Sequence, residues 1–203
     1  MKKILRKYIS KFSKYSLIYE NAFDLIKAIN LHKIELVIDI GASIGQYSLM
    51  LRRFGYKNYI YSVEPVSNSF QKLKINCSND KKWIVKQCII SNKDERKIKI
   101  NVSKDFDNSS IYNATDLHLK NHNGAKFLYS EEIETKSLDK LFYSDIERKD
   151  NMMLKIDTQG SELDILKGAK TSISNCSLIY LECPIIEYNL QSPNLNNYIE
   201  YLN

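Results

Sequence analysis

The turn between Val37 and Gln46 carries residues whose types and spacing predict a small-molecule binding site. Asp39 ends an apolar run, and Gly41 and Gly45 follow it closely. Glycines at such positions let the backbone approach a ligand and let a strand pack tightly against the next helix. The start of that helix offers free N–H groups and a positive dipole end to an anion.

The carboxylate of Asp39 sets this turn apart from a dinucleotide-binding loop. Such a loop has a glycine at this position, and the pyrophosphate lies at the helix N-terminus. A carboxylate would repel a pyrophosphate, but it suits a ligand with an ammonium group beside a carboxylate. The methionine end of S-adenosylmethionine has this chemistry. We therefore expect S-adenosyl-L-methionine as the cofactor, the alternative being a purely structural glycine turn.

A second acidic residue supports this interpretation. Glu64, followed by Pro65, stands at the end of the next predicted strand, where a carboxylate can accept hydrogen bonds from both ribose hydroxyls of an adenosine. The residues expected to bind the cofactor come from this turn and from the ends of the predicted strands. They are Asp39, Gly41, Ala42, Ser43, Gly45, Gln46, Glu64, Pro65, Ile90, Ser91, Asp157 and Gln159.

Asp157 is the predicted catalytic residue. It follows an apolar strand, and ligands of open α/β sheets bind at the carboxyl ends of the strands. Methyl transfer to a hydroxyl requires an acceptor oxygen positioned behind the methyl group and a group that removes its proton. Asp157 could be the base, an acceptor-orienting group or a metal ligand; alternatively it caps the following helix turn.

Other charged residues receive structural interpretations. Lys155 and Glu182 interrupt apolar strands, and because buried charges are usually paired, we expect an ion pair between them. Glu162 is expected to be a first-turn helix acid. His118 and His122 have the spacing of a metal pair on a helix, but no further ligand pattern completes a site. We expect solvated loop histidines and no metal.

The elements that must position these residues alternate between strand and helix. This order predicts an α/β, Rossmann-like, mostly parallel sheet with helices on both faces. A polar segment at 103–130 is expected to be a loop or insertion that contributes to the acceptor pocket. Strands are predicted at 35–39, 59–63, 83–90, 97–102, 152–156 and 178–181, and helices at 45–54, 67–76, 137–143, 162–170 and from 198 onward.

The N-terminal segment forms a separate prediction. Residues 4–18 have the spacing of an amphipathic helix, and a short helix is expected at 21–29. We expect residues 1–30 to be a helical lid on a methyltransferase domain at 31–203. The alternative is an interfacial helix, in which residues 2–16 contact anionic lipid.

Charge and composition limit the partners and the compartment. The net charge of +6 originates before Glu20, and the balance elsewhere argues against nucleic acid as a partner. No stretch of about 18 apolar residues is present, no signal peptide begins the chain, and the four cysteines lack CxxC spacing. We expect a cytoplasmic protein with reduced thiols. The oligomeric state is not indicated.

The segment from Leu154 to Ala169, LKIDTQGSELDILKGA, resembles the FkbM-type methyltransferase family. The segment from Asp39 to Pro65, the segment IETKSLD and the strand ending in Glu182 extend this resemblance over about residues 34–183. It implies the class I methyltransferase sheet and O-methylation of a hydroxyl, commonly on a sugar of a glycan or glycolipid.

The acceptor is left open by this resemblance. The alternatives are a lipid, peptide or small natural product as acceptor, or a cofactor-binding module or partner subunit without turnover. Because family members usually continue with another helix and closing strands, we expect a short or C-terminally truncated member.

Overall fold

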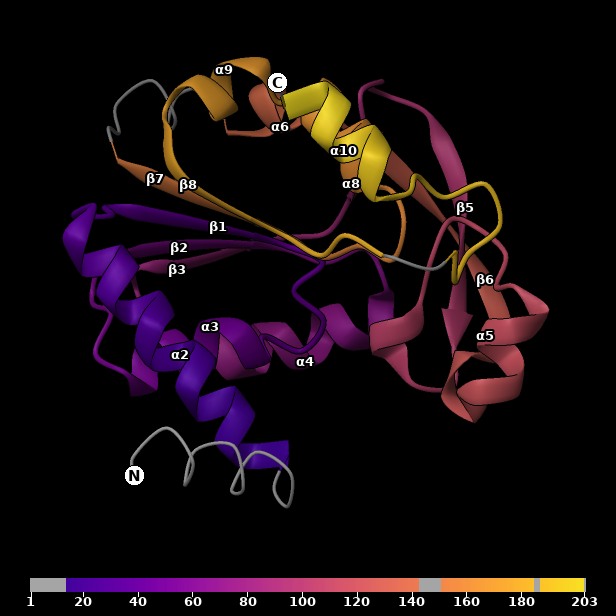
Figure 1. Cartoon of the computed structure of the whole chain (residues 1–203), viewed down its shortest axis with the longest axis horizontal. Coiled ribbons are helices and arrows are strands. Elements are labelled where there is room, and N and C mark those ends of the chain that lie inside the picture. Colours follow the sequence, from indigo (N-terminus) through magenta and orange to yellow (C-terminus); the bar gives the residue numbers. More distant parts are fainter. Residues whose placement is uncertain (1–13, 143–150, 185–186, 203) are drawn as a thin grey trace.

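A parallel sheet of five strands forms the centre of the molecule (Figure 1). The computed structural model describes residues 14–142, 151–184 and 187–202. The strand order is β3-β2-β1-β7-β8, and every pairing in this sheet is parallel. The predicted fold class is therefore confirmed. The strands are β1 (Leu36–Ile40), β2 (Tyr59–Val63), β3 (Trp83–Lys86), β7 (Met152–Ile156) and β8 (Cys176–Leu181).

Helices cover both faces of this sheet (Figure 1). The central strands β1 and β7 are buried along their whole length, which explains why both are nearly continuous apolar runs. One face carries α2 (Lys14–Leu31), α3 (Gln46–Arg53) and α4 (Ser67–Cys77). The other carries α6 (Leu138–Leu141), α8 (Glu162–Lys167), α9 (Lys170–Ser174) and α10 (Leu195–Leu202).

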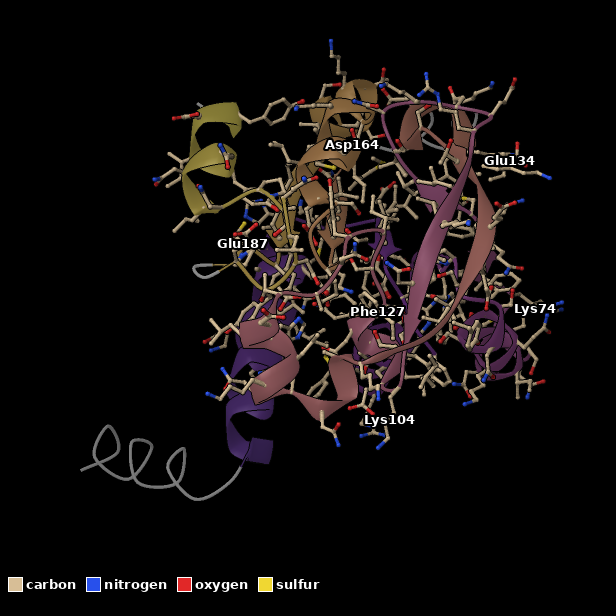
Figure 2. The ribbon with its side chains drawn as sticks, turned by 90° about the vertical axis from the view of Figure 1, so that its right-hand side faces the viewer. Lys74, Lys104, Phe127, Glu134, Asp164 and Glu187 are labelled. Atoms are coloured by element: carbon tan, nitrogen blue, oxygen red, sulfur yellow. The ribbon has the colours of Figure 1, made fainter. Side chains whose placement is uncertain are left out.

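A second, smaller sheet stands at one end of the molecule, where Figure 2 shows its long ribbon facing the viewer. It consists of β4 (Ile89–Ile90), β5 (Lys97–Ser103) and β6 (Phe127–Lys136), with β5 and β6 antiparallel. The strand predicted at 83–90 is therefore divided, because β3 pairs with β2 whereas β4 leaves the main sheet to pair with β6.

The polar segment 103–130 is more ordered than the prediction of a loop. It contains η1 (Phe106–Asn108), α5 (Asp116–Asn121), η2 (Asn123–Ala125) and the start of β6. Sequence reasoning missed β6 because its outer positions are largely polar and exposed. Its pairing with β5 brings Ile133 opposite Ile98, and this contact between distant segments was not visible in the local pattern.

The ends of the described chain differ from the prediction in detail. The helix expected at 21–29 is part of the longer α2, in which Ala22 and Ile29 are buried. Residues 1–13 lie outside the described residues, and with them the first part of the predicted lid and most of the predicted lipid-contacting segment 2–16. The helix expected at 162–170 is divided into α8 and α9. In the part of the chain that is described, no helix is long and apolar enough to cross a membrane.

Gly45 and Gly55 allow a direct test of how α3 packs on the sheet. Both have nearly the same positive φ, 91° and 93°. A Cβ on Gly45 would meet the Leu73 and Trp83 side chains at 2.8 Å, whereas a Cβ on Gly55 would meet nothing within 4 Å. Each alanine variant should lose about 1–2 kcal/mol of unfolding free energy from backbone strain.

Gly45→Ala should lose about 1–3 kcal/mol more than Gly55→Ala, because its methyl group overpacks the contact with Trp83. Urea denaturation of both variants measures the difference. Equal losses would show that the close packing at Gly45 does not contribute to the free energy of unfolding.

Candidate active site

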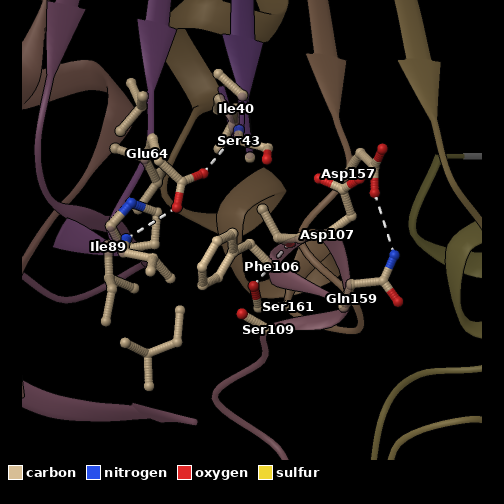
Figure 3. A pocket seen from close by; sticks show the side chains of 18 of the residues that line it. Ile40, Ser43, Glu64, Ile89, Phe106, Asp107, Ser109, Asp157, Gln159 and Ser161 are labelled. Atoms are coloured by element: carbon tan, nitrogen blue, oxygen red, sulfur yellow. Dashed lines mark hydrogen bonds between the residues drawn. The ribbon is translucent and has the colours of Figure 1, made fainter. Parts of the chain in front are cut away.

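A cavity of about 420 Å³ opens at the carboxyl ends of the strands (Figure 3). Its walls come from the turn after β1, the end of β2, β4, η1, and the segments that follow β7 and β8. This is the edge at which open α/β sheets bind ligands, and the volume lies in the range of small-molecule sites. The predicted site residues that line it are Gly41, Ala42, Ser43, Gln46, Glu64, Pro65, Ile90, Asp157 and Gln159.

Three predicted cofactor residues do not line this cavity. Asp39 is completely buried behind its wall. Gly45 lies against Leu73 and Trp83, as described above. Ser91 donates a hydrogen bond of 2.7 Å to Asp164 and so connects β4 to α8. The structure therefore separates the predicted residues into those that face the cavity and those that support it.

The turn after β1 is fixed by its neighbours on both sides. The N–H groups of Gly41 and Ala42 donate to the carbonyl of Val63 at 3.0 and 3.1 Å. A Cβ on Gly41 would lie 1.8 Å from the carbonyl oxygen of Asp157, so only glycine fits here. Gly41 thus allows the loops after β1 and β7 to approach each other across the cavity floor.

Glu64 presents a buried carboxyl group to the cavity (Figure 3). Its two oxygens accept hydrogen bonds from the N–H groups of Ser43 and Val66, both at 2.8 Å. Burial raises the pKa of Glu64 to about 7, against the opposing effect of these two hydrogen bonds. Because each carboxylate oxygen has two lone pairs, both oxygens can still accept from a ligand.

Asp39 and Lys155 form a buried ion pair behind the cavity floor. Lys155 Nζ lies 3.1 Å from Asp39 Oδ1, and their side chains are 6% and 0% exposed. Ser48 donates a 3.0 Å hydrogen bond to the other oxygen of Asp39. Asp39, which we expected to contact the cofactor, therefore does not face the cavity. It holds Lys155, which does.

Lys155 also connects the loops on either side of it. Its Nζ donates to the carbonyl of Gly41 at 3.2 Å and lies 3.4 Å from Asp157 Oδ2. Burial opposes the charge of Lys155, but the carboxylates of Asp39 and Asp157 outweigh it and raise the pKa. The predicted pair with Glu182 is wrong: the β7–β8 register places Lys155 opposite Tyr180, so Glu182 lies beyond the strand end.

Asp157 and Glu182 are joined by the amide of Gln159. Its Nε2 donates to Asp157 Oδ1 at 3.3 Å, shown dashed in Figure 3, and to Glu182 Oε2 at 3.1 Å. Burial raises the pKa of Asp157, but the hydrogen bond with Glu182 and the charge of Lys155 lower it overall. The hydrogen bond with Asp157, together with burial, raises the pKa of Glu182 to about 8. The pKa of Glu182 therefore lies above that of Asp157.

Sequence reasoning did not name Glu182 or any single residue of η1 as a site residue, although it expected the segment 103–130 to contribute to the acceptor pocket. Glu182 had a signal that could have found it, since it follows an apolar strand at the same sheet edge as Asp157. The η1 segment contributes Phe106, Asp107 and Asn108 to the cavity wall, and Lys72 Nζ lies 5.0 Å from the centre of the Phe106 ring. A single phenylalanine in a polar segment was too weak a signal.

Glu162 begins α8, as predicted, and it is almost completely buried. Its oxygens accept from the N–H groups of Thr158 and Gly160 and from the hydroxyl of Tyr198. It thereby fixes the turn after β7 and connects α10 to α8.

The prediction of solvated histidines is wrong for His118, which is 4% exposed and packs on His122 and Tyr188. Neither histidine lines the cavity. Over the described ranges, no group of three or more His, Cys, Asp or Glu residues is arranged to hold a metal ion.

The parallel strand order and the cavity at the carboxyl edge define a Rossmann-like α/β fold with a ligand site. The methyltransferase FkbM domain matches residues 39–202. The chain belongs to this family, which confirms the resemblance seen in the sequence and assigns methyl transfer as the class of reaction. Comparison with curated proteins and with solved structures gave no significant match.

Lys155→Met should strongly destabilise the protein because it leaves Asp39 buried without its cation. We expect a loss of about 3–5 kcal/mol of unfolding free energy, and the double variant Asp39→Asn/Lys155→Met should recover a large part of it. Urea denaturation at neutral pH is the measurement. Lys140→Met is the matched control, because it breaks an exposed ion pair with Glu95 and should change the stability little.

A loss in Lys155→Met no larger than in Lys140→Met would mean that the buried pair does not stabilise the cavity floor.

Proposed function

We propose that this protein is an S-adenosylmethionine-dependent O-methyltransferase that methylates a sugar hydroxyl of a glycan or glycolipid. The observation that carries the proposal is the arrangement of acidic groups in one cavity. Glu64 stands at one end of it, and the Asp157–Glu182 pair stands at the other. The family match supports methyl transfer as the reaction.

The residues present fit S-adenosylmethionine. The Glu64 carboxyl keeps lone pairs that can accept from the two ribose hydroxyls, and two backbone hydrogen bonds hold it in place. The turn residues Gly41, Ala42 and Ser43 would hold the methionine end. The purine ring would contact an apolar wall made of Ile89, Ile90, Ile100, Phe106 and Ile111.

The bound cofactor would supply a methyl group activated by a sulfonium charge. The residues of this chain would then have to place an acceptor oxygen in line with that methyl group and to remove the proton of the hydroxyl. Asp157 is suited to orient the acceptor, because Lys155 and Gln159 fix its two oxygens.

The polar end of the cavity favours a polyhydroxylated acceptor. Asp157, Gln159 and Glu182 offer carboxyl and amide groups side by side, and such groups can bind neighbouring hydroxyls of a sugar. A lipid, peptide or small natural product is the alternative acceptor. A cofactor-binding partner subunit without turnover is the alternative function.

Glu64→Ala should weaken S-adenosylmethionine binding by about 1.5–3 kcal/mol, which is roughly a 10- to 100-fold rise in Kd. The reason is the loss of the carboxyl group that accepts from the ribose. Isothermal titration calorimetry measures the Kd, with Glu132→Ala on the exposed face of β6 as control. Parental affinity in Glu64→Ala would refute the assignment of the ribose site.

The acceptor is tested with methyl-labelled cofactor and a panel of sugars, glycolipids, peptides and lipids. Labelled sugar or glycolipid is the expected product. Label transferred only to a peptide or lipid would contradict the sugar proposal, and tight cofactor binding without any product would favour the partner subunit.

A further inference from the structure

A second cavity of about 360 Å³ adjoins the first. Gln159 and Glu182 line both cavities, so the two spaces meet at these side chains. The remaining wall of the second cavity comes from the turn before α8 and from the segment after β8. It consists of Gly160, Glu162, Cys183, Pro184, Tyr188, Asn189 and Ser192.

We propose that the second cavity admits the methyl acceptor and that Glu182, at the border of the two cavities, is the base that takes the proton from the acceptor hydroxyl. This inference rests on the proposed function and identifies a catalytic residue for it. The O–H bond breaks and its proton moves to a Glu182 oxygen. A new O–CH₃ bond forms while the methyl–sulfur bond breaks and leaves its electron pair on sulfur.

The other acidic groups near this border are already engaged. Asp157 lies 3.4 Å from the Lys155 ammonium, which keeps its carboxylate ionised but weakens it as a base. Glu162 accepts from two backbone N–H groups and from Tyr198, and it is 1% exposed. No histidine in the described part of the chain lines either cavity.

Glu182 combines access with a fixed orientation. It lines both cavities and is partly open to solvent, and no ion pair involving it is found among the described residues. Gln159 donates to its Oε2 at 3.1 Å. The carbonyl of Gln159 in turn accepts from Ser110 at 2.8 Å and from Asn189 at 2.7 Å. The insertion and the segment after β8 thus hold the backbone of Gln159, whose side-chain amide orients Glu182.

The backbone of Gln159 supports a functional role for this border. Its φ is 59°, a left-handed conformation that is unfavourable for a residue with a side chain. Such strain persists where surrounding contacts enforce it, and it clusters at functional sites. Here it accompanies the placement of one amide between two carboxyl groups.

The pKa of Glu182 sets the pH range in which it can act as a base. Its pKa of about 8 results from the hydrogen bond with Asp157 and from burial. A base works in its deprotonated form, so the rate should rise with pH and level off above about 8. Replacing Asp157 by Asn removes the neighbouring negative charge, which should lower the pKa of Glu182 and move this rise to lower pH.

The test compares Glu182→Gln with Glu132→Gln, a control on the exposed side of β6. Cofactor Kd should remain at the parental value in both variants. The rate of methyl transfer to the acceptor found with the panel should fall about 10²–10⁴-fold in Glu182→Gln only, and the rise with pH should disappear. Parental turnover in Glu182→Gln would overturn the inference while leaving the proposed function intact, whereas failure of the parent to bind S-adenosylmethionine would refute the proposed function itself.

A second measurement needs no acceptor. Carbon NMR of protein labelled at the glutamate carboxyl carbons, with the signal assigned by its loss in Glu182→Gln, follows the titration of this group. A midpoint near 8 that decreases in Asp157→Asn is expected. A midpoint at the ordinary value of a free glutamate, about 4.3, that does not move in Asp157→Asn would contradict the contact between the two carboxyl groups that positions Glu182.

Discussion

The buried ion pair between Asp39 and Lys155 is the interaction on which the candidate site depends. Taking both charges out of water is costly, so the pair must be held by close contacts. Asp39 is anchored through Ser48, which is hydrogen-bonded to Ser62, and Ser62 accepts from the Trp83 indole. The pair therefore connects β1 and β7 to a chain of polar groups that extends through α3 and β2 to β3.

This pair also organises the cavity floor. Lys155 reaches the Gly41 carbonyl on one side and Asp157 on the other, so a single ammonium group fixes two of the loops that face the cavity. Its charge lowers the pKa of Asp157, and the ionised Asp157 raises the pKa of Glu182. The electrostatic properties of the polar end of the cavity thus originate in a contact that a ligand would not touch.

Much of the fold could be predicted because its signals are local. The buried strands β1, β2 and β7 are short apolar runs, and the glycines Gly41 and Gly45 indicate the turn after β1. Glu64 could be placed because strand ends of a parallel sheet share one edge. The ion-pair partner of Lys155 could not be predicted, because the pairing with Asp39 depends on the register between β1 and β7. The burial of His118 and the pairing of β6 depend on contacts between segments far apart in sequence, which no local pattern encodes.

The most direct test of this account is a crystal structure of the protein with S-adenosylhomocysteine, the product form of the cofactor. The account predicts the ribose hydroxyls on the Glu64 carboxyl, the purine against Phe106, and the sulfur directed toward the end of the cavity that holds Asp157 and Glu182. A ligand bound elsewhere, or bound with its ribose away from Glu64, would contradict it.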